Sequence, residues 1–470
     1  MHSEASGEQR PIEAAGRGAG LLFLVAAAIF CLRQINSFDV FWYLRTGEEI
    51  LRRHALVQTD PFSYTSDQPW TNHEWLAEIC FALVHRVGGT AGLVVFQAVA
   101  VAAVLAILMH KHRPSAHGER WPAWLGLACA TVTLGLSAEP RAQLLSWVLF
   151  AATLSICFSD LARPSWRLVW VLPIGVLWAN LHGGNPTGVA LVGILFLARP
   201  SRRRALVAAG ALLATLASPY GLRVHGHFLG AHGSLPEIRE WYPLYRALAM
   251  GSVPQWAALL SALLACAMLA LRYRRREPIR FESMALLVFF AIAARYARFT
   301  GELSILSAGS LLRATAVGPS RLLPARRGLG FAFALVLLVL VWTTAAQPAG
   351  LGLNTKRIPV GAVEFLQRQQ LPGPMLNSYN FGGYLMWAYP REKVFIDSRA
   401  FMIYSEAHFR DLLHLYETPP FFRELERRWH FRLAVLQRAG RGAGFAAWLR
   451  AQPDWQVLYE DGTATVLCKK

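Results

Sequence analysis

The sequence predicts a polytopic α-helical membrane protein of about eleven spans, followed by a small C-terminal α/β domain outside the membrane. Hydrophobic residues make up 54% of the 470 residues. Many apolar runs approach the roughly 17–25 residues that cross a bilayer. Arginine and lysine concentrate in short gaps at one end of these runs, as in cytoplasmic loops of membrane proteins. The net charge of +18 therefore indicates membrane topology, and we expect no nucleic-acid partner.

The apolar runs give the order of the spans. Residues 18–35 follow a polar leader and have no convincing cleavage region, so we interpret them as an uncleaved first span with a cytoplasmic N-terminus. Every even-numbered span exits into a basic segment, which places the C-terminus on the opposite side of the membrane. The later spans are predicted near residues 88–109, 121–138, 141–161, 167–181, 186–199, 204–218, 254–271, 281–297, 301–317 and 328–347.

Two large external parts remain. We expect a membrane domain of residues 1–349, with a first external loop of about 36–87, and an extracytoplasmic α/β domain of residues 350–470. In this tail, PVGAVEFLQRQQ, HFRDLLHLYE and FFRELERRW are typical of helices. VFIDSR and FRLAVLQ are typical of buried strands, and WQVLYEDGTATVLCK predicts a hairpin with an Asp-Gly turn.

The first external loop predicts two amphipathic helices. FDVFWYLRTGEEI combines aromatic residues typical of a membrane interface with a charged face, so we expect a helix in the headgroup plane. The second helix follows NHE. Its apolar residues recur at helical spacing, and they are Leu76, Ile79, Cys80, Leu83 and Val87.

Polar and ionisable residues gather at the external ends of the apolar runs. Such residues are costly at membrane depth and usually mark a functional site, so we expect one extracytoplasmic reaction chamber. The scattered cysteines form no cluster with zinc spacing, and we predict no metal site. The candidate residues are Asp39, His73, Glu74, Arg141, Asn180, His182, Tyr220, Glu240, Arg295 and Arg298.

Several of these residues have a structural alternative. Asp39 directly follows the first span, where its carboxylate can act as a general base or cap the next helix. Glu74 is the second candidate base, yet with His73 it also begins a helix, where a negative charge stabilises the dipole. Arg141 belongs to a tight hairpin, where it can form an ion pair with Glu139.

Longer sequence runs resemble a known family. FDVFWYLRTGEEI and DPFSYTSDQPWTNHEWLAE resemble the first periplasmic loop of bacterial GT-C membrane glycosyltransferases, relatives of the dolichyl-phosphate-mannose and lipid A aminoarabinose transferases. The resemblance covers most of the chain, including the tail. Its further parts are AEPRAQLLSW, WANLHGGNPTG, SPYGLRVHG, EIREWYP, RYARF, NSYNFGGYLMW and VFIDSR.

This resemblance implies a bacterial inner-membrane protein with a GT-C-like membrane domain and a periplasmic tail. It implies a polyprenyl-phosphate sugar as donor, a glycan, lipid or protein as acceptor, and Asp39 as catalytic base. Many members carry a second acidic residue beside this one, whereas Val40 and Phe41 follow Asp39 here. We therefore predict no obligatory metal and no cofactor.

The other candidates are assigned to substrate binding. Arg295, Arg298 and Glu302 are spaced i, i+3 and i+7, which predicts one helix face that binds phosphate or, alternatively, arginines that snorkel to lipid headgroups. Asn180 and His182 end a span, where His182 can donate to phosphate or to a sugar hydroxyl, or be structural. Tyr220 and Glu240 lie in a second external loop.

Two other classes of function fit the same pattern. A transporter or flippase of a lipid-linked saccharide would need polar residues on both sides of the spans, because a carrier opens both ways. A non-catalytic envelope assembly protein can retain the fold without the reaction. Membrane lipids are partners in every case.

Overall fold

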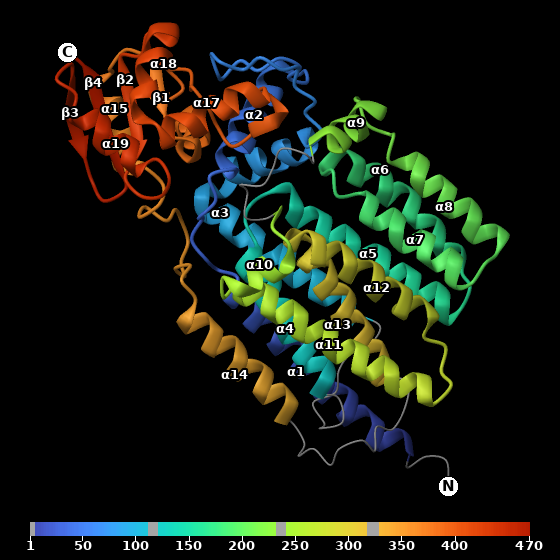
Figure 1. Ribbon diagram of the computed structural model, residues 1–470. Coiled ribbons are helices and arrows are strands. Elements are labelled where there is room, and N and C mark those ends of the chain that lie inside the picture. The colour runs from blue at the N-terminus through green and yellow to red at the C-terminus, as the bar shows by residue number, and fades with distance from the viewer. Residues whose placement is uncertain (1–4, 111–120, 232–240, 317–328) are drawn as a thin grey trace.

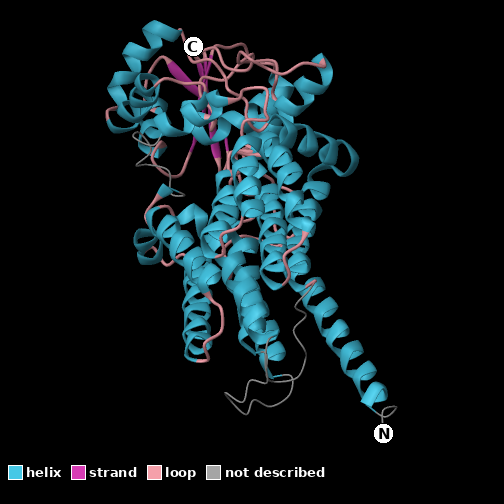
Figure 2. Cartoon of the chain, turned by 90° about the vertical axis from the view of Figure 1, so that its right-hand side faces the viewer, coloured by secondary structure: helices cyan, strands magenta, loops and turns pink. Residues whose placement is uncertain are grey.

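A computed structural model gives the architecture of residues 5–110, 121–231, 241–316 and 329–470. A bundle of long helices forms most of the molecule, and the small sheet of the tail lies over one end of this bundle (Figures 1 and 2). The N-terminal helix begins near the opposite end. The tail lies at the end of the bundle where the candidate polar residues of the predicted spans are found.

Each predicted span forms a helix. Within the described residues, three helices are long and apolar enough to cross a membrane: α3 (Trp75–Met109), α5 (Ala142–Ala162) and α11 (Val253–Arg274). The count of eleven spans therefore stays a prediction. The others are shorter or less apolar. They are α1 (Ala5–Phe30), α4 (Trp121–Ser137), α6 (Val171–Leu181), α7 (Pro186–Ala198), α8 (Arg202–Ala214), α12 (Arg280–Arg295), α13 (Thr300–Ala316) and α14 (Leu329–Thr344). Short helices join them, namely η2 (Trp166–Trp170), α9 (Leu222–Ala231) and α10 (Leu244–Ala249).

The first external loop forms α2 (Val40–Arg53) and the start of α3, which continues through a kink at Gly89 into the span. The expectation that α2 lies in the headgroups is wrong, because Phe41, Trp42 and Tyr43 are buried inside the protein. The backbones of α2 and α3 touch. A Cβ atom at Gly47 would lie 2.2 Å from the carbonyl oxygen of Glu78, so no larger residue fits there.

The tail contains the predicted helices α15 (Val360–Gln369), α17 (Glu406–Glu417) and α18 (Phe422–Trp429), together with η5 (Tyr379–Phe381), α16 (Gly382–Ala388), η6 (Ala400–Met402), η7 (Pro419–Phe421) and α19 (Ala443–Arg450). Its sheet has the order β1-β2-β4-β3. The strands are β1 (Met375–Asn377), β2 (Leu433–Gln437), β3 (Trp455–Glu460) and β4 (Ala464–Lys469).

The sheet pairs β1 with β2 in parallel, and the remaining neighbours are antiparallel. The predicted hairpin and the FRLAVLQ strand are confirmed as β3, β4 and β2. The predicted VFIDSR strand is wrong, although Val394, Phe395 and Ile396 are fully buried. Val394 pairs with Ser63 of the first external loop in an isolated bridge, so this segment joins the loop and is not part of the sheet.

The described part of the chain forms two hydrophobic cores. The first is formed by the helices of the bundle, including α1, α4, α5 and α13. The second contains the sheet and helices of the tail together with α2, the first external loop and the start of α3. The loop therefore folds as part of the tail, and the residues that begin α2 and α3 are held between the two cores.

Candidate functional site

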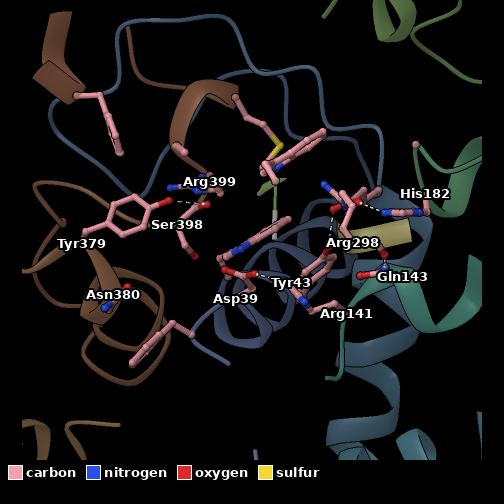
Figure 3. A pocket seen from close by; sticks show the side chains of 18 of the residues that line it. Asp39, Tyr43, Arg141, Gln143, His182, Arg298, Tyr379, Asn380, Ser398 and Arg399 are labelled. Carbon is pink, nitrogen blue, oxygen red and sulfur yellow. Dashed lines mark hydrogen bonds and ion pairs between the residues drawn. The ribbon is translucent and has the colours of Figure 1, made fainter. Parts of the chain in front are cut away.

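A cavity of about 950 Å³ lies where the bundle meets the tail (Figure 3). The bundle and the first loop contribute most of its ionisable residues, namely Asp39, His73, Glu74, Arg141, His182, His225, Arg298 and Glu302. The tail contributes mainly uncharged residues, including Ser378, Tyr379, Asn380, Ser398, Phe409, Leu412, Leu413, Tyr416 and Gln437. Six of the predicted site residues therefore line one cavity: Asp39, His73, Glu74, Arg141, His182 and Arg298.

Asp39 stands at the N-cap position of α2. Among the described residues, its side chain accepts no hydrogen bond from a backbone N–H of the first turn of that helix, so the capping alternative lacks its defining contact. Instead Asp39 Oδ2 accepts a hydrogen bond of 3.0 Å from Arg141 Nη1. The Asp39 side chain is 27% exposed and lines the cavity, where a substrate can reach it.

Glu74 is held more tightly than Asp39. The Tyr43 hydroxyl donates to Glu74 Oε2 at 2.5 Å, and Nε2 of His73 and of His182 lie 3.7 and 3.5 Å from Glu74 Oε1. Burial, together with the negative charge of Glu74, raises the pKa of Tyr43 well above its usual value. Tyr43 therefore keeps its proton and remains a hydrogen-bond donor to the carboxylate.

His182 is oriented by a chain of hydrogen bonds that starts inside the bundle. Trp178 Nε1 donates to Ser146 Oγ at 2.7 Å, and Ser146 Oγ lies 2.6 Å from His182 Nδ1. Gly184 N–H also donates to His182 Nδ1, at 3.1 Å. Because an indole can only donate, the Ser146 hydroxyl proton points to His182. Nδ1 is thus the acceptor, and Nε2 carries the hydrogen toward Glu74 and the cavity.

The charge state of His182 follows from its surroundings. Burial lowers the pKa of His182 well below its usual value, and the nearby Arg298, His73 and Arg141 lower the pKa further. The ring is therefore neutral at pH 7. A neutral imidazole with hydrogen on Nε2 offers one donor to the cavity and no net charge.

The prediction that Arg295, Arg298 and Glu302 share one helix face is wrong. α12 ends at Arg295, Tyr296 has extended backbone with φ −140° and ψ 104°, and η4 (Ala297–Phe299) precedes α13. The break separates the two arginines. Arg298 lines the cavity with its guanidinium carbon 4.5 Å from the centroid of the Trp241 ring. Arg295 lies outside the described lining, and its guanidinium carbon is 4.7 Å from the centroid of the Tyr296 ring.

Three further candidates are not in the described lining of the cavity. Asn180 joins three segments: its Oδ1 accepts from Trp75 Nε1 at 3.1 Å, and its Nδ2 donates to the carbonyls of Val176 and Ala217 at 2.9 and 2.7 Å. Such a pattern uses both ends of the amide in structural bonds. Tyr220 lies in the turn before α9, and Glu240 falls outside the described residues.

Sequence reasoning missed several residues that the cavity or its hydrogen bonds use. Tyr43 is part of an aromatic run that is typical of an interface, which hides its contact with Glu74. Ser146, like Gln143, is a polar residue in the first turns of an apolar span, and that position is a signal that could have indicated it. Tyr379, Asn380 and Gln437 come from the tail, whose place over the bundle no local pattern reveals.

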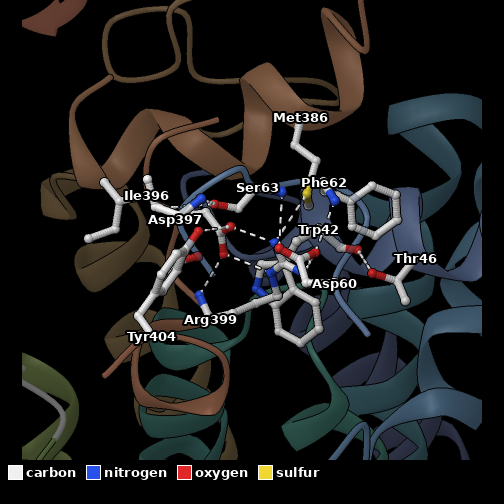
Figure 4. A network of polar contacts seen from close by, with 12 residues as sticks. Trp42, Thr46, Asp60, Phe62, Ser63, Met386, Ile396, Asp397, Arg399 and Tyr404 are labelled. Atoms are coloured by element: carbon white, nitrogen blue, oxygen red, sulfur yellow. Dashed lines mark hydrogen bonds and ion pairs between the residues drawn. The ribbon is translucent and has the colours of Figure 1, made fainter. Parts of the chain in front are cut away.

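A buried ion-pair network holds the tail against the first external loop (Figure 4). Arg399 is fully buried, and its Nη1 donates to Asp60 Oδ1 at 2.7 Å while Nη2 donates to Asp397 Oδ2 at 2.6 Å. Tyr404 O–H also donates to Asp397 Oδ2, at 2.9 Å. Burial would raise the pKa of Asp397, but the charge of Arg399 and its hydrogen bonds prevail and lower it. The network therefore remains charged, and it joins the loop to the tail.

The comparisons with known proteins place this architecture in a structural class. The sequence matches no protein-family model and no curated protein. Among solved structures, ArnT from Cupriavidus metallidurans bound to undecaprenyl phosphate is similar, with a TM-score of 0.56 and 12% identity over 95% of this chain and 97% of that one. The apo Archaeoglobus fulgidus oligosaccharyltransferase is similar with a TM-score of 0.55 and 13% identity over 91% of this chain and 71% of that one.

These two proteins are GT-C glycosyltransferases, so the chain has the GT-C membrane glycosyltransferase fold, and the expected resemblance is confirmed at the level of fold. The apo form of the same ArnT is also similar, with a TM-score of 0.54 and 11% identity over 99% of this chain and 98% of that one. The coverage shows that bundle and tail together belong to the shared fold.

Loss of Arg399 should destabilise the protein more than loss of a comparable surface arginine. Arg399→Ala leaves Asp60 and Asp397 buried without their cation, and breaking such a pair costs about 3–5 kcal/mol. Arg423→Ala is the control, because the side chains of Arg423 and Asp454 are 39% and 36% exposed. An exposed pair contributes roughly 0–1 kcal/mol. Thermal unfolding in detergent measures both; equal falls in melting temperature would contradict the role of the network.

The hydrogen bonding of His182 Nδ1 should depend on Ser146. In Ser146→Ala the indole N–H of Trp178 loses its acceptor, at a cost of about 1–3 kcal/mol, and Nδ1 loses one of its two donors. We expect the ¹⁵N signal of Nδ1 to shift, while the Gly184 N–H still keeps Nδ1 as the acceptor and the hydrogen on Nε2. ¹⁵N NMR of histidine-labelled protein measures this, with His182→Gln to assign the signal.

The control for Ser146 is Ser159→Ala on the same helix, since Ser159 Oγ donates to the carbonyl of Ser155, one turn earlier, at 2.6 Å. Its spectrum should equal that of the original protein. Because burial lowers the pKa of His182, its signal should also show no protonation near pH 6.5, where an exposed histidine is half protonated. A His182 signal that titrates there, or is unchanged in Ser146→Ala, would refute the assignment.

Proposed function

We propose that the chain is a membrane glycosyltransferase that moves a sugar from a polyprenyl-phosphate donor to an acceptor at the periplasmic face of a bacterial inner membrane. One observation carries the proposal: a carboxylate, two arginines and an oriented neutral histidine line one cavity between the bundle and the tail. A base, phosphate-binding cations and a cleft reached from the membrane are the parts that this transfer requires. The N-terminus is cytoplasmic in this proposal.

Asp39 is the proposed general base. The acceptor hydroxyl oxygen attacks the anomeric carbon, its proton passes to Asp39, and the bond from that carbon to the phosphate oxygen breaks. Polyprenyl phosphate leaves as an anion. A single displacement of this kind inverts the anomeric configuration. Arg141 holds one oxygen of the Asp39 carboxylate, which orients the carboxylate in the cavity.

Glu74 is the second candidate base, and its contacts make it less suited to the task. Its two oxygens already face the Tyr43 hydroxyl and the nitrogens of His73 and His182. A carboxylate whose oxygens already face several donors is less free to contact the acceptor hydroxyl. We assign Glu74 to orienting Tyr43 and the two histidines.

Arg298 is the proposed ligand of the donor phosphate. Its guanidinium group packs on Trp241 and lines the cavity on the side of His182. A guanidinium fork matches two oxygens of a phosphate and stabilises the charge that develops as the phosphate leaves. His182 Nε2–H can donate to the same group. ArnT, whose fold the chain shares, has been solved with undecaprenyl phosphate bound, which supports a donor of this class.

Replacing Asp39 by asparagine should abolish transfer without unfolding the protein. The side chain keeps its size but can no longer accept the proton, and loss of a general base costs about 10²–10⁴-fold in rate. Transfer by the purified protein measures this effect. Glu48→Gln on the same helix is the control, because Glu48 lies outside the described cavity lining. Near-normal activity of Asp39→Asn would remove Asp39 from the mechanism and favour Glu74.

Replacing Arg298 by lysine should weaken binding of the polyprenyl-phosphate donor. Lysine keeps the charge but loses the fork, and a charged hydrogen bond contributes about 1.5–3 kcal/mol, so donor KM should rise roughly 10- to 100-fold. Arg295→Lys is the matched control, since Arg295 is three residues away and outside the described lining. It should leave donor KM nearly unchanged. Equal KM values in both variants would count against phosphate binding by Arg298.

A further inference from the structure

The two sides of the cavity differ in their chemistry. On the bundle side, carboxylates, arginines and histidines supply the groups that a transfer reaction needs. On the tail side the lining is mostly amide, hydroxyl, aromatic and aliphatic. Its arginines are Arg399 and Arg441, and Arg399 is neutralised by Asp60 and Asp397. Apart from Arg441, a ligand on this side therefore meets mainly uncharged groups among the described lining residues.

An amide pair is the central feature of this wall. Asn380 Nδ2 donates to Gln437 Oε1 at 3.0 Å, so one acceptor oxygen and one donor nitrogen of the pair remain for a ligand. Within the described residues, neither Asn380 Oδ1 nor Gln437 Nε2 has a hydrogen-bond partner. Reversing both amides would still leave one donor and one acceptor. The pair therefore offers both polarities within one site.

The sheet holds this pair in place. Gln437 is the last residue of β2, and its N–H donates to Ser378 Oγ at 2.8 Å. Ser378 N–H donates in turn to the carbonyl of Val435 at 3.1 Å, which extends the parallel pairing of β1 with β2. Asn380 follows two residues later in η5. Groups fixed by rigid strands bind a ligand with little loss of entropy.

Aromatic and aliphatic groups stand beside the amides. The Tyr379 hydroxyl donates to the carbonyl of Ser398 at 3.4 Å, and the rings of Tyr379 and Phe409 form a T-shaped pair with centroids 5.7 Å apart. Helix α17 lines the cavity with Phe409, Leu413 and Tyr416. Hydrogen-bonding groups beside an apolar surface suit a sugar ring, which has hydroxyl groups around its edge and C–H groups on its faces.

We propose that this wall is the acceptor subsite and that the acceptor is an uncharged saccharide, with the Asn380–Gln437 pair binding its hydroxyl groups. The proposal rests on the proposed function and adds the class of acceptor. A hydroxyl both donates and accepts, so neighbouring hydroxyls satisfy the free oxygen and the free nitrogen of the pair together. A phosphate-bearing acceptor would call for a cluster of cations, which the bundle side has and this wall lacks among its described residues.

The position of the wall suits this role. In Figure 3, Tyr379 and Asn380 lie on one side of Asp39, and Arg298 and His182 lie on the other. Transfer needs the same order in space, because the acceptor must lie on one side of the base and the anomeric carbon, and the departing phosphate on the other. A saccharide held by Asn380 and Gln437 presents its hydroxyl to Asp39 from the side opposite the phosphate.

Photocrosslinking in membranes of the source cells tests the proposal with the full-length chain. Benzoylphenylalanine replaces Leu413 on the acceptor wall, Thr187 on the bundle side, or Glu417, which is exposed on the same helix as Leu413. Mass spectrometry identifies what each position captures. We expect a neutral saccharide at Leu413, polyprenyl phosphate at Thr187, and neither at Glu417. A peptide, a charged glycan, a lipid or nothing at Leu413 overturns the saccharide proposal.

Variants of the amide pair then test the named residues. Asn380→Ala and Gln437→Ala should each reduce saccharide capture at Leu413 by about tenfold, as expected for loss of one or two hydrogen bonds. Capture at Thr187 should persist, which shows that the variants fold. Gln452→Ala, elsewhere in the tail, is the control. Undiminished capture at position 413 overturns the role of the pair. If the crosslinker at position 187 captures no polyprenyl phosphate when Asn380 and Gln437 are intact, the result counts against the proposed function.

Discussion

The buried contact of Arg399 with Asp60 and Asp397 is the interaction on which the rest of the site depends. It joins the first external loop, which begins α2 and α3, to a tail that lies more than three hundred residues later in the chain. An arginine between two carboxylates in a protein interior is stable only when all three stay together. The contact therefore makes the loop part of the tail, and the second hydrophobic core grows around it.

The position of Asp39 follows from this arrangement. α16 of the tail approaches α2 so closely that a Cβ atom at Gly383 would lie 2.7 Å from the carbonyl oxygen of Phe38. Phe38 directly precedes Asp39, so the tail fixes the backbone from which the carboxylate projects. Arg141 then binds the carboxylate from the bundle side. Asp39 is thus held between two bodies that contribute different chemistry: ionisable groups from the bundle, and amides and aromatic rings from the tail.

Much of this architecture could be predicted from the sequence. Apolar runs place the helices, because burial in lipid or in a bundle requires continuous hydrophobic surface. Alternation and turn residues place β2, β3 and β4. Local patterns fail where the partner is distant. The aromatic residues of α2 suit an interface and a protein core equally well, and hydropathy cannot tell these surroundings apart. VFIDSR looks like a strand, yet its pairing residue Ser63 lies in the first loop.

The same reasoning explains which site residues were found. Asp39, Glu74 and Arg298 are charged residues at the ends of apolar runs, where a charge is costly and its presence is informative. Arg295 has the same local signal, but a break in the helix at Tyr296 separates it from the cavity. Asn180 also ends a span, and its amide instead joins α3 to neighbouring backbone. Ser146, Asn380 and Gln437 are ordinary polar residues, and only the fold brings them to the cavity or to His182.

The central claim is that the chain transfers a sugar from a lipid-linked donor to an external acceptor. Mass spectrometry of lipid-linked sugars and surface glycans in a deletion strain and in its complemented counterpart tests this most directly. The account predicts that the deletion strain accumulates the polyprenyl-phosphate sugar and that its acceptor lacks one sugar, both restored by complementation. Unchanged donor and glycans would contradict the claim. Accumulation of a complete lipid-linked saccharide would instead indicate a flippase.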